Sequence, residues 1–298
     1  MNRRFLYIVN EKAGTRTKKD LVAFIERQTT EKQIPFERVA SVAGGDYSFL
    51  KPLIREKAVT DVIIAGGDGT VNQAIQSLRG EDVNFGIIPC GSGNGLALAA
   101  GISRSPETAL QIAFAGKARA IDAFQINEHF SCMLSGLGFD AKVAHDFAAQ
   151  PTRGLATYIR QVMRNFFSAP VYSFTLGTDE HSLSFDAYFV CIANGNQFGN
   201  NFTIAPKASM EDGLLDIVIA TKQTKLALLV NTLSQVTGRN LVQEGSINLK
   251  KGIVYFRTGR LTLVNHSAAP LHVDGEPVTT ADQFSIELLP RCYRLLQP

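Results

Sequence analysis

The segment 62–75, VIIAGGDGTVNQAI, joins an apolar run, a glycine-rich loop with one aspartate, and a helix-like stretch. This order predicts a β-strand followed by a loop that opens a helix. Gly66, Gly67 and Gly69 have no Cβ, so the loop can adopt positive φ and let an anion approach the backbone. A helix starting near Thr70 would add free N–H groups and a positive dipole end. A tight turn also favours glycine and aspartate, but three glycines around an acid directly after a strand favour phosphate binding.

The loop differs from the two commonest phosphate-binding motifs. A Walker A loop ends in Gly-Lys-Ser or Gly-Lys-Thr, and the chain has neither. The dinucleotide fingerprint needs a third glycine where Asn72 stands. In place of a lysine the loop offers Asp68, which repels phosphate unless Mg²⁺ lies between them. The loop therefore predicts a metal–nucleotide complex.

Two further glycine-bearing loops follow short apolar strands. The segment 85–101 predicts a strand, a loop and a small-residue helix, and its loop offers Ser92 and Asn94 for hydrogen bonding. Either side chain could equally be a helix cap. At the N-terminus, the strand Phe5–Val9 leads into the loop Asn10–Gly14. Ligands of open α/β sheets bind at the carboxyl edge of the strands, so the three loops predict one shared site.

The ordered motifs resemble those of the diacylglycerol kinase catalytic-domain superfamily, which includes bacterial lipid kinases, sphingosine kinases and ceramide kinases. GGDGT alone also occurs in NAD kinases, whereas the full set in this order is specific. The likeness extends over essentially the whole chain, through Asn10–Gly14, Gly66–Thr70, Pro89–Asn94, Gly136–Asp140, Gly199–Pro206, Glu211–Asp216 and His272–Pro277.

The resemblance implies an ATP- and Mg²⁺-dependent lipid kinase. Such an enzyme transfers the γ-phosphate to a hydroxyl of diacylglycerol or a related lipid, a sphingoid lipid included, as part of phospholipid metabolism. Two alternatives stay open: an NAD-kinase-like enzyme, and a protein that binds nucleotide and lipid with little turnover. The second arises because Gly95 and Gln73 stand where many members carry acids.

The resemblance places the nucleotide on the three loops and the end of the second strand. The residues expected to bind it are Asn10, Glu11, Lys12, Ala13, Gly14, Ser41, Gly66, Gly67, Asp68, Gly69, Thr70, Asn72, Gly91, Ser92, Gly93 and Asn94.

The catalytic acids are also expected from the resemblance. Asp122 would join Asp68 in holding the nucleotide's Mg²⁺, directly or through water. The general base is assigned to Asp274, with Glu276 as the close competitor. Local sequence alone would favour an ordinary Asp-Gly hairpin turn at this point.

A second, structural Mg²⁺ site is implied by the segment 209–214. The carboxylate of Asp212 and the backbone carbonyls of Ser209 and Leu214 would be its ligands. An oxygen-only ligand set suits a hard cation. An Asp-Gly turn between strands is equally compatible with the sequence.

The chain changes character near Asp122. Before it, helices such as 106–115 alternate with short apolar strands, which predicts an NAD-kinase-like α/β domain with a parallel sheet over residues 1–122. After it, period-two runs, among them a predicted strand over 130–134, predict an antiparallel β-sandwich over 123–288 that forms the lipid-substrate domain. The last residues, 289–298, are expected to pack back on the first domain.

Composition and charge predict the class of protein and its cellular compartment. Of the 298 residues 45% are hydrophobic and 19% charged, as in ordinary globular domains. No apolar run is long enough for a membrane span, and the one at the N-terminus stops at Asn10, too short for a signal peptide. A net charge of +3 is too small to indicate nucleic-acid binding. The four scattered cysteines suit a reducing cytoplasm.

The segment Arg153–Phe174 is basic with interleaved aromatic residues. Most such helices simply pack on their own domain. For a kinase that takes its lipid from a bilayer, a basic amphipathic helix is a candidate contact with the inner face of the membrane. We therefore expect a cytoplasmic protein in peripheral membrane contact, with a homodimer as one option for its assembly.

Overall fold

The computed structural model describes residues 3–11, 18–150, 155–166, 168–177, 182–197, 203–237, 239, 242–243 and 247–298. Its chain divides into two compact units, Met1–Ile121 with Arg291–Pro298, and Asp122–Pro290. Three expected nucleotide ligands, Lys12, Ala13 and Gly14, lie outside the described residues, as do Arg153 and positions 199–202.

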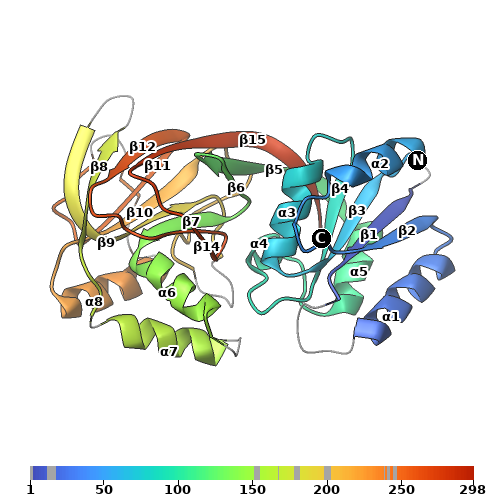
Figure 1. The fold of residues 1–298 in the computed structure, drawn as a ribbon, viewed down its shortest axis with the longest axis horizontal. Coiled ribbons are helices and arrows are strands. Elements are labelled where there is room, and N and C mark those ends of the chain that lie inside the picture. The colour runs from blue at the N-terminus through green and yellow to red at the C-terminus, as the bar shows by residue number, and fades with distance from the viewer. Residues whose placement is uncertain are drawn as a thin grey trace. The chain divides into compact units, whose positions relative to one another are not determined.

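The first unit contains a parallel sheet in the order β2-β1-β3-β4 (Figure 1). The strands are β1 (Phe5–Val9), β2 (Phe36–Ala40), β3 (Asp61–Gly66) and β4 (Asn84–Pro89). Strands β1 and β3 are buried along their whole length, as apolar strands covered on both faces must be. The end of β15 (Gln283–Gln297) adds a fifth parallel strand, since Arg294 and Leu295 pair with β4.

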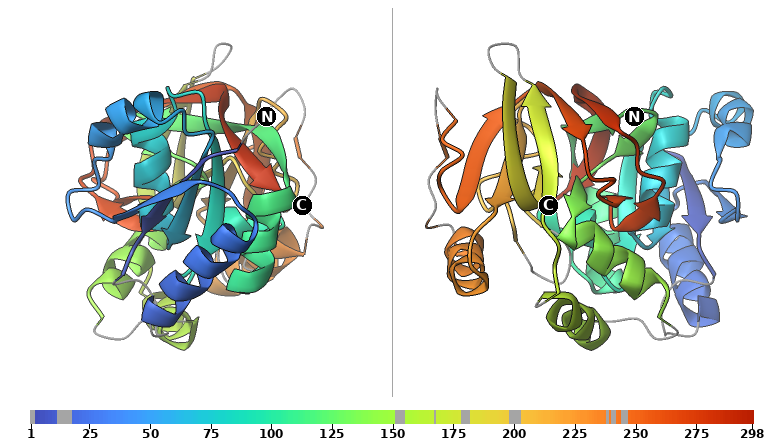
Figure 2. Two further views of the ribbon diagram at one scale, coloured as in Figure 1. Left: turned by 90° about the vertical axis from the view of Figure 1, so that its right-hand side faces the viewer. Right: turned by 60° about the vertical axis from the view of Figure 1, so that its left-hand side comes forward.

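Helices cover both faces of this sheet (Figure 2). On one face lie α1 (Lys18–Glu31) and α5 (Pro106–Ala115): Tyr7 of β1 hydrogen-bonds Thr29 of α1, and Phe5 stacks on Phe114 of α5. Phe5 and Tyr7 are two residues apart and therefore point to the same side of the strand. The other face carries a 3₁₀ turn (Ser48–Leu50), α2 (Lys51–Glu56), α3 (Asp68–Leu78) and α4 (Gly95–Ala99).

The second unit is built from antiparallel strands. Its central strand is β9 (Ser182–Ala193), whose first half pairs with β8 and whose second half pairs with β7 and β10. A β-bulge opposite Ala220 and Thr221 lies where the partners change, and such irregularities let one strand serve two sheets. The other strands are β5 (Lys117–Ile126), β6 (His129–Ser131), β7 (Leu134–Gly138), β8 (Tyr172–Gly177), β10 (Leu215–Thr221), β11 (Ile253–Thr258), β12 (Arg260–Asn265), β13 (Leu271–Val273), β14 (Glu276–Val278) and the first part of β15.

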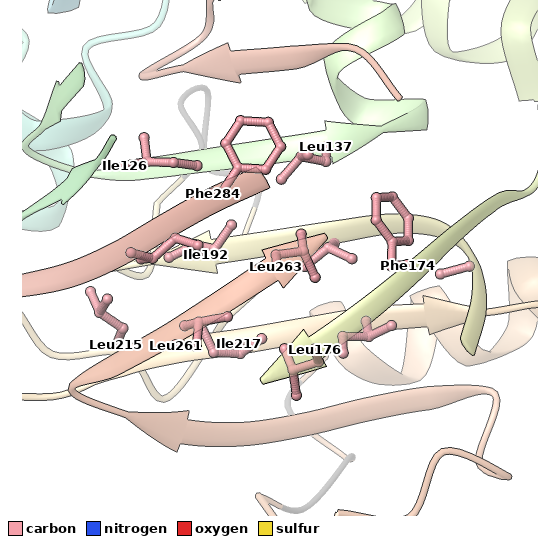
Figure 3. Close-up of a cluster of buried hydrophobic side chains, with 14 of the residues drawn as sticks. Ile126, Leu137, Phe174, Leu176, Ile192, Leu215, Ile217, Leu261, Leu263 and Phe284 are labelled. Atoms are coloured by element: carbon pink, nitrogen blue, oxygen red, sulfur yellow. The ribbon is translucent and has the colours of Figure 1, made fainter. Parts of the chain in front are cut away.

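Apolar side chains from these strands fill the core of the second unit (Figure 3). Leu176, Ile192, Ile217 and Leu263 come from four different strands and are fully buried. Alternate residues of a strand point to one face, which is why the period-two runs of the sequence become one continuous core. The predicted fold class, a parallel α/β domain followed by an antiparallel β-sandwich, is confirmed.

The described part of the second unit contains three helices: α6 (Phe139–Ala148), α7 (Leu155–Phe166) and α8 (Lys225–Val236). Helix α6 was not expected, nor was a strand break within the predicted strand 130–134. The break separates β6 from β7 at Cys132 and Met133, whose N–H groups donate to the side chain of Asp274 instead of to a neighbouring strand.

Candidate active site

The three glycine-bearing loops leave the same edge of the parallel sheet. Residues Val9 of β1 and Ala65 of β3 are paired, and Ala65 is paired in turn with Ile88 of β4. The N–H of Cys90 donates to the carbonyl of Gly66 at 2.8 Å, which extends the pairing of β3 and β4 into their loops. The loops therefore begin side by side, because parallel strands end at a common edge.

Specific hydrogen bonds tie the loops to one another. The Asn10 side-chain amide donates to Oγ1 of Thr70 at 2.8 Å, joining the first loop to the second. The N–H of Asn94 donates to Oδ2 of Asp68 at 2.7 Å, joining the third loop to the second. A Cβ on Gly91 would come within 2.7 Å of the Gly67 Cα, so the second and third loops touch backbone to backbone. Only glycine permits this approach.

The start of helix α3 presents backbone donors to this edge. Gly67 is its N-cap in an extended conformation, and no side chain of the described residues caps the helix there. The first N–H groups of a helix have no partner within the helix, so they are available to an anion. A small pocket lies here, lined by Gly66, Gly67, Asp68, Val71, Ile87, Asn94, Leu96 and Ala97.

Asn94 is held in a left-handed conformation, with φ 55°. Its Oδ1 accepts the N–H of Gly91 at 2.8 Å, and its Nδ2 donates to the Gly91 carbonyl at 2.7 Å. Asparagine tolerates this conformation better than most residues because its side chain bonds the nearby backbone. The side chain of Asn94 therefore shapes the third loop, and its N–H fixes Asp68.

Four other expected nucleotide ligands occupy the rim of the same edge. Glu11 is exposed, with Oε1 3.8 Å from a guanidinium nitrogen of Arg38. Ser41 follows β2, and its N–H donates to the Val9 carbonyl at 2.8 Å. Ser92 is exposed on the third loop, and Asn72 is half-buried on α3.

In the second unit, Asp274 lies at a hairpin turn in the left-handed conformation, with φ 49°. Its Oδ1 accepts hydrogen bonds from the Ser131 hydroxyl (2.6 Å) and the N–H groups of Met133 (3.1 Å) and Leu134 (3.0 Å). Its Oδ2 accepts one from the N–H of Cys132 at 3.0 Å. The carboxylate therefore organises the crossing from β6 to β7. Glu276, the competing candidate, is exposed at the start of β14.

A buried histidine supports the same hairpin. His272 is fully buried on β13, and its Nδ1 accepts the N–H of Gly275 at 3.2 Å. Its Nε2 lies 3.5 Å from Oδ2 of Asp140, in the first turn of α6. With Nδ1 accepting, the ring hydrogen sits on Nε2, the nitrogen on the side of Asp140. This Asp140–His272 pair was not among the expected site residues, although both lie within the family's motifs.

Asp122 is almost completely buried, and two of its hydrogen bonds join it to the segment 209–214. Its Oδ2 accepts the N–H of Gly213 at 2.8 Å, and its own N–H donates to the Met210 carbonyl at 2.8 Å. Asp68 and Asp122 belong to different units, so a cation shared between them stays a prediction.

The segment proposed for the structural cation carries two exposed carboxylates, Glu211 and Asp212, and a buried one, Asp216, follows it. Oδ1 of Asp212 accepts the N–H of Leu214 at 3.1 Å, and its Oδ2 lies 3.7 Å from Arg257. Asp216 is fully buried, Tyr255 donates to its Oδ1 at 2.5 Å, and burial raises the pKa of Asp216 to about 6. No cluster of three or more His, Cys, Asp or Glu side chains that could hold a metal ion is found within the described part of the chain. The expected ligand set includes only one such side chain, that of Asp212, because its other two ligands are backbone carbonyls.

Comparisons with known proteins agree with this arrangement. Residues 4–126 match the family model of the diacylglycerol kinase catalytic domain, and residues 134–297 match the YegS C-terminal NAD kinase beta sandwich-like domain. The chain belongs to the YegS-like lipid kinase family. The resemblance inferred from the motifs is thereby confirmed, and the chain is an enzyme of the lipid kinase class.

Relatives in this family match most of the chain. "Probable lipid kinase YegS-like" of Enterobacter sp. (strain 638) is 32% identical over 249 residues, which are 80% of this chain and 79% of the relative. "Probable lipid kinase YegS" of Shigella flexneri is 30% identical over 263 residues, 85% of this chain and 83% of the relative.

Solved structures share the fold of this family member. A diacylglycerol kinase from Bacillus anthracis str. Sterne aligns with a TM-score of 0.75 at 18% identity, covering 99% of this chain and 97% of that one. Another structure from the same organism aligns with a TM-score of 0.82 at 19% identity, with the same coverage. At sequence identities this low, the similarity to these structures shows a shared fold and nothing about function.

Proposed function

We propose that this kinase transfers the γ-phosphate of ATP, in a Mg²⁺-dependent reaction, to a hydroxyl of diacylglycerol or a related lipid, sphingoid lipids included. The observation that carries the proposal is the junction of Asp68 with Asn94 at the uncapped start of α3. It brings one carboxylate, two glycine loops and the first N–H groups of the helix to one edge of the sheet, which is a combination suited to a metal-bound polyphosphate.

The nucleotide is assigned to the carboxyl edge of the first unit. Backbone N–H groups of 67–70 face the phosphates, because helix N-termini attract anions. The third loop, Gly91–Asn94, forms the opposite wall, and Asn10 and Thr70 fix the first loop beside it. Lys12, Ala13, Gly14 and Ser41 complete the proposed set on the strength of the family resemblance.

Mg²⁺ would be held with the nucleotide by Asp68 and, from the second unit, by Asp122. Both side chains offer carboxylate oxygens, the ligand type that Mg²⁺ prefers. Bound there, the ion would neutralise charge on the phosphates during transfer. The second cation, held by Asp212 and the carbonyls of Ser209 and Leu214, would stabilise the segment that Asp122 contacts through Gly213.

Asp274 is proposed as the general base. Oδ1 accepts three of the four hydrogen bonds, and Oδ2 accepts one. Oδ2 is thus the better candidate to take the proton of the lipid hydroxyl, while the hydroxyl oxygen bonds to the γ-phosphorus and the bond from that phosphorus to the departing ADP breaks. The Asp140–His272 pair would act as a positioning element, since His272 holds the turn through Gly275.

Peripheral contact with the inner face of the membrane completes the proposal. No helix in the described ranges is both long and apolar enough to cross a bilayer. On α7, Arg160 and Arg164 are exposed one turn apart, while Gln161 and Asn165 are buried. Exposed cations of this kind suit anionic headgroups.

The test is transfer of radiolabel from γ-labelled ATP into a total lipid extract, then into dioleoylglycerol, sphingosine and NAD separately, with and without Mg²⁺. Label in a lipid, dependent on Mg²⁺, supports the proposal. Label in NAD alone would establish the NAD-kinase-like alternative. Tight ADP binding without transfer to any acceptor would establish a binding protein.

A further inference from the structure

Helix α8 is oriented with its polar side chains inward and its apolar side chains outward. Gln235 is fully buried and donates to the Ile204 carbonyl at 2.8 Å. Asn231 donates to Oε1 of Gln223 at 2.6 Å. A surface helix of a globular unit ordinarily shows the reverse arrangement, with apolar residues facing the core. Among the side chains of α8 that the structure describes, Leu228 is the one large apolar residue buried in the unit.

The outer face of α8 carries a continuous apolar stripe. Its members are exposed to 73% (Leu226), 46% (Leu229), 54% (Val230) and 58% (Leu233). Spacings of three and four residues place all four on one side of the helix. Among the described residues the only other large exposed hydrophobic side chain is Phe49, in the first unit. The apolar stripe is therefore a local feature of α8 and not a property of the whole surface.

Exposed cations lie near both ends of α8, and the segment 222–243 contains no acidic residue. Lys222 precedes α8 and Arg239 follows it, and both are exposed. The exposed Lys250 and Lys251 lie beside the start of the helix, since Thr221 donates to the Lys251 carbonyl at 2.7 Å. Asp186 lies 3.8 Å from the ammonium of Lys222.

We infer that α8 docks on a lipid surface carrying anionic headgroups. Its four apolar side chains enter the boundary between headgroups and acyl chains, and the cations around them contact phosphates. Helix α8 is held to the unit by polar contacts and lies at its margin in Figure 1 and in the right view of Figure 2. The inference deepens the proposed function, because a lipid acceptor resides in such a surface.

A second copy of the chain fits the same surface less well. Four half-exposed aliphatic side chains offer on the order of 300 Å² of apolar area, well below the roughly 800 Å² that each partner of a stable complex buries. In a symmetric pair the two copies would also bring their cations face to face. Binding to a bilayer requires neither a large complementary protein surface nor acidic side chains opposite the cations of α8.

The test measures binding without turnover. The full chain is mixed with vesicles of equimolar phosphatidylcholine and phosphatidylglycerol, and bound protein is separated by flotation. Replacing Leu226 and Leu233 together with glutamine should weaken vesicle binding by about tenfold or more. The midpoint of thermal unfolding should stay unchanged because both side chains are exposed. Phe49→Gln, an equally exposed apolar residue outside the stripe, is the matched control and should bind like the parent.

A second variant tests the charges. Lys250→Gln combined with Lys251→Gln should weaken binding to the mixed vesicles, and the parent's binding should fall as salt rises. Parent protein that does not bind the mixed vesicles, or a leucine variant that binds them like the parent, overturns the inference. So does a parent that is a dimer by light scattering and becomes monomeric when the leucines are replaced.

Turnover separates this inference from the proposed function. With a short-chain diacylglycerol dissolved as monomers, the leucine variant should keep the parent's kcat/KM, whereas its KM for diacylglycerol in vesicles should rise. Vesicle binding that depends on the stripe in a chain that transfers no phosphate would sustain the inference and end the kinase proposal.

Discussion

Oδ2 of Asp68 accepts a 2.7 Å hydrogen bond from the backbone N–H of Asn94, so the acid of the second glycine loop fixes the third loop. Gly93 takes part in the same contact, because a Cβ there would come within 2.8 Å of that oxygen. The carboxylate thus has a structural partner in addition to its proposed metal, and the two roles can be separated by mutation.

Asp68→Asn keeps a side-chain oxygen that can accept the Asn94 N–H but removes the charge. Asp68→Ala removes both. If the charge holds Mg²⁺, both variants should lose roughly a thousandfold in kcat/KM, several kcal/mol of transition-state stabilisation. The unfolding midpoint of the asparagine variant should match the parent's. Activity of a tenth of the parent or more in Asp68→Asn would mean that the residue acts through Asn94 and not through a metal.

Asp274→Asn should lower kcat by about a hundredfold or more while ADP affinity changes by less than about threefold. Glu276→Gln should lower kcat less than Asp274→Asn does. Since Asp274 also holds the β6–β7 crossing, Ser131→Ala is the control: it removes one donor to Oδ1, keeps the carboxylate, and should cost about 1 kcal/mol of stability with most activity retained. The opposite ranking of the Asp274 and Glu276 variants would move the base to Glu276.

Gly136→Ala should destabilise the second unit by about 1–3 kcal/mol. A Cβ there would overlap the Asp140 carboxylate and come 2.7 Å from Nε2 of the buried His272. To make room for the alanine Cβ, the side chains of Asp140 and His272 would have to move apart, which would loosen the hairpin that carries Asp274. Denaturant unfolding measures the effect, and Gly259→Ala is the control, since a Cβ there meets nothing closer than 4.0 Å. Equal stabilities for the two variants would show that the Asp140–His272 contact is not tightly packed.

Mg²⁺ should raise the thermal unfolding midpoint of the parent by a few degrees, because a ligand bound only to the folded state stabilises it. Asp212→Ala should abolish this increase, since it removes the one side-chain ligand expected at the structural site. Glu211→Ala alters the neighbouring exposed acid and should respond to Mg²⁺ like the parent. A response that survives in Asp212→Ala would place the stabilising cation elsewhere.

Much of the first unit could be predicted from local sequence. Each apolar run followed by glycines became a buried strand, and the parallel order brought Asn10, Thr70 and Asn94 together. Local signals suffice here because strand, loop and helix are consecutive in the chain, and parallel strands end at one edge. The expected helix 106–115 was also found with these bounds, with Pro106 at its first turn and Ser105 as its cap.

The second unit depended more on contacts distant in sequence. Asp274 bonds residues 131–134, about 140 positions earlier, and these bonds break the predicted strand 130–134 in two. Helix α6 escaped prediction because it begins within a glycine motif, at Gly138 with φ 93°. The local sequence around Asp274 gives no sign of its partners at 131–134, and the glycine motif around Gly138 does not indicate that a helix begins there.

The sequence by itself determined the order of strands, loops and helices and the type of each domain, because hydrophobic periodicity and glycine placement act locally. Tertiary structure alone decided that Asp68 bonds Asn94, that His272 meets Asp140, and that α8 turns its leucines to solvent. Amphipathicity identifies two faces of a helix but not which one is inside. That choice was made by Gln235 and Asn231, whose hydrogen bonds exist only once the chain has folded around them.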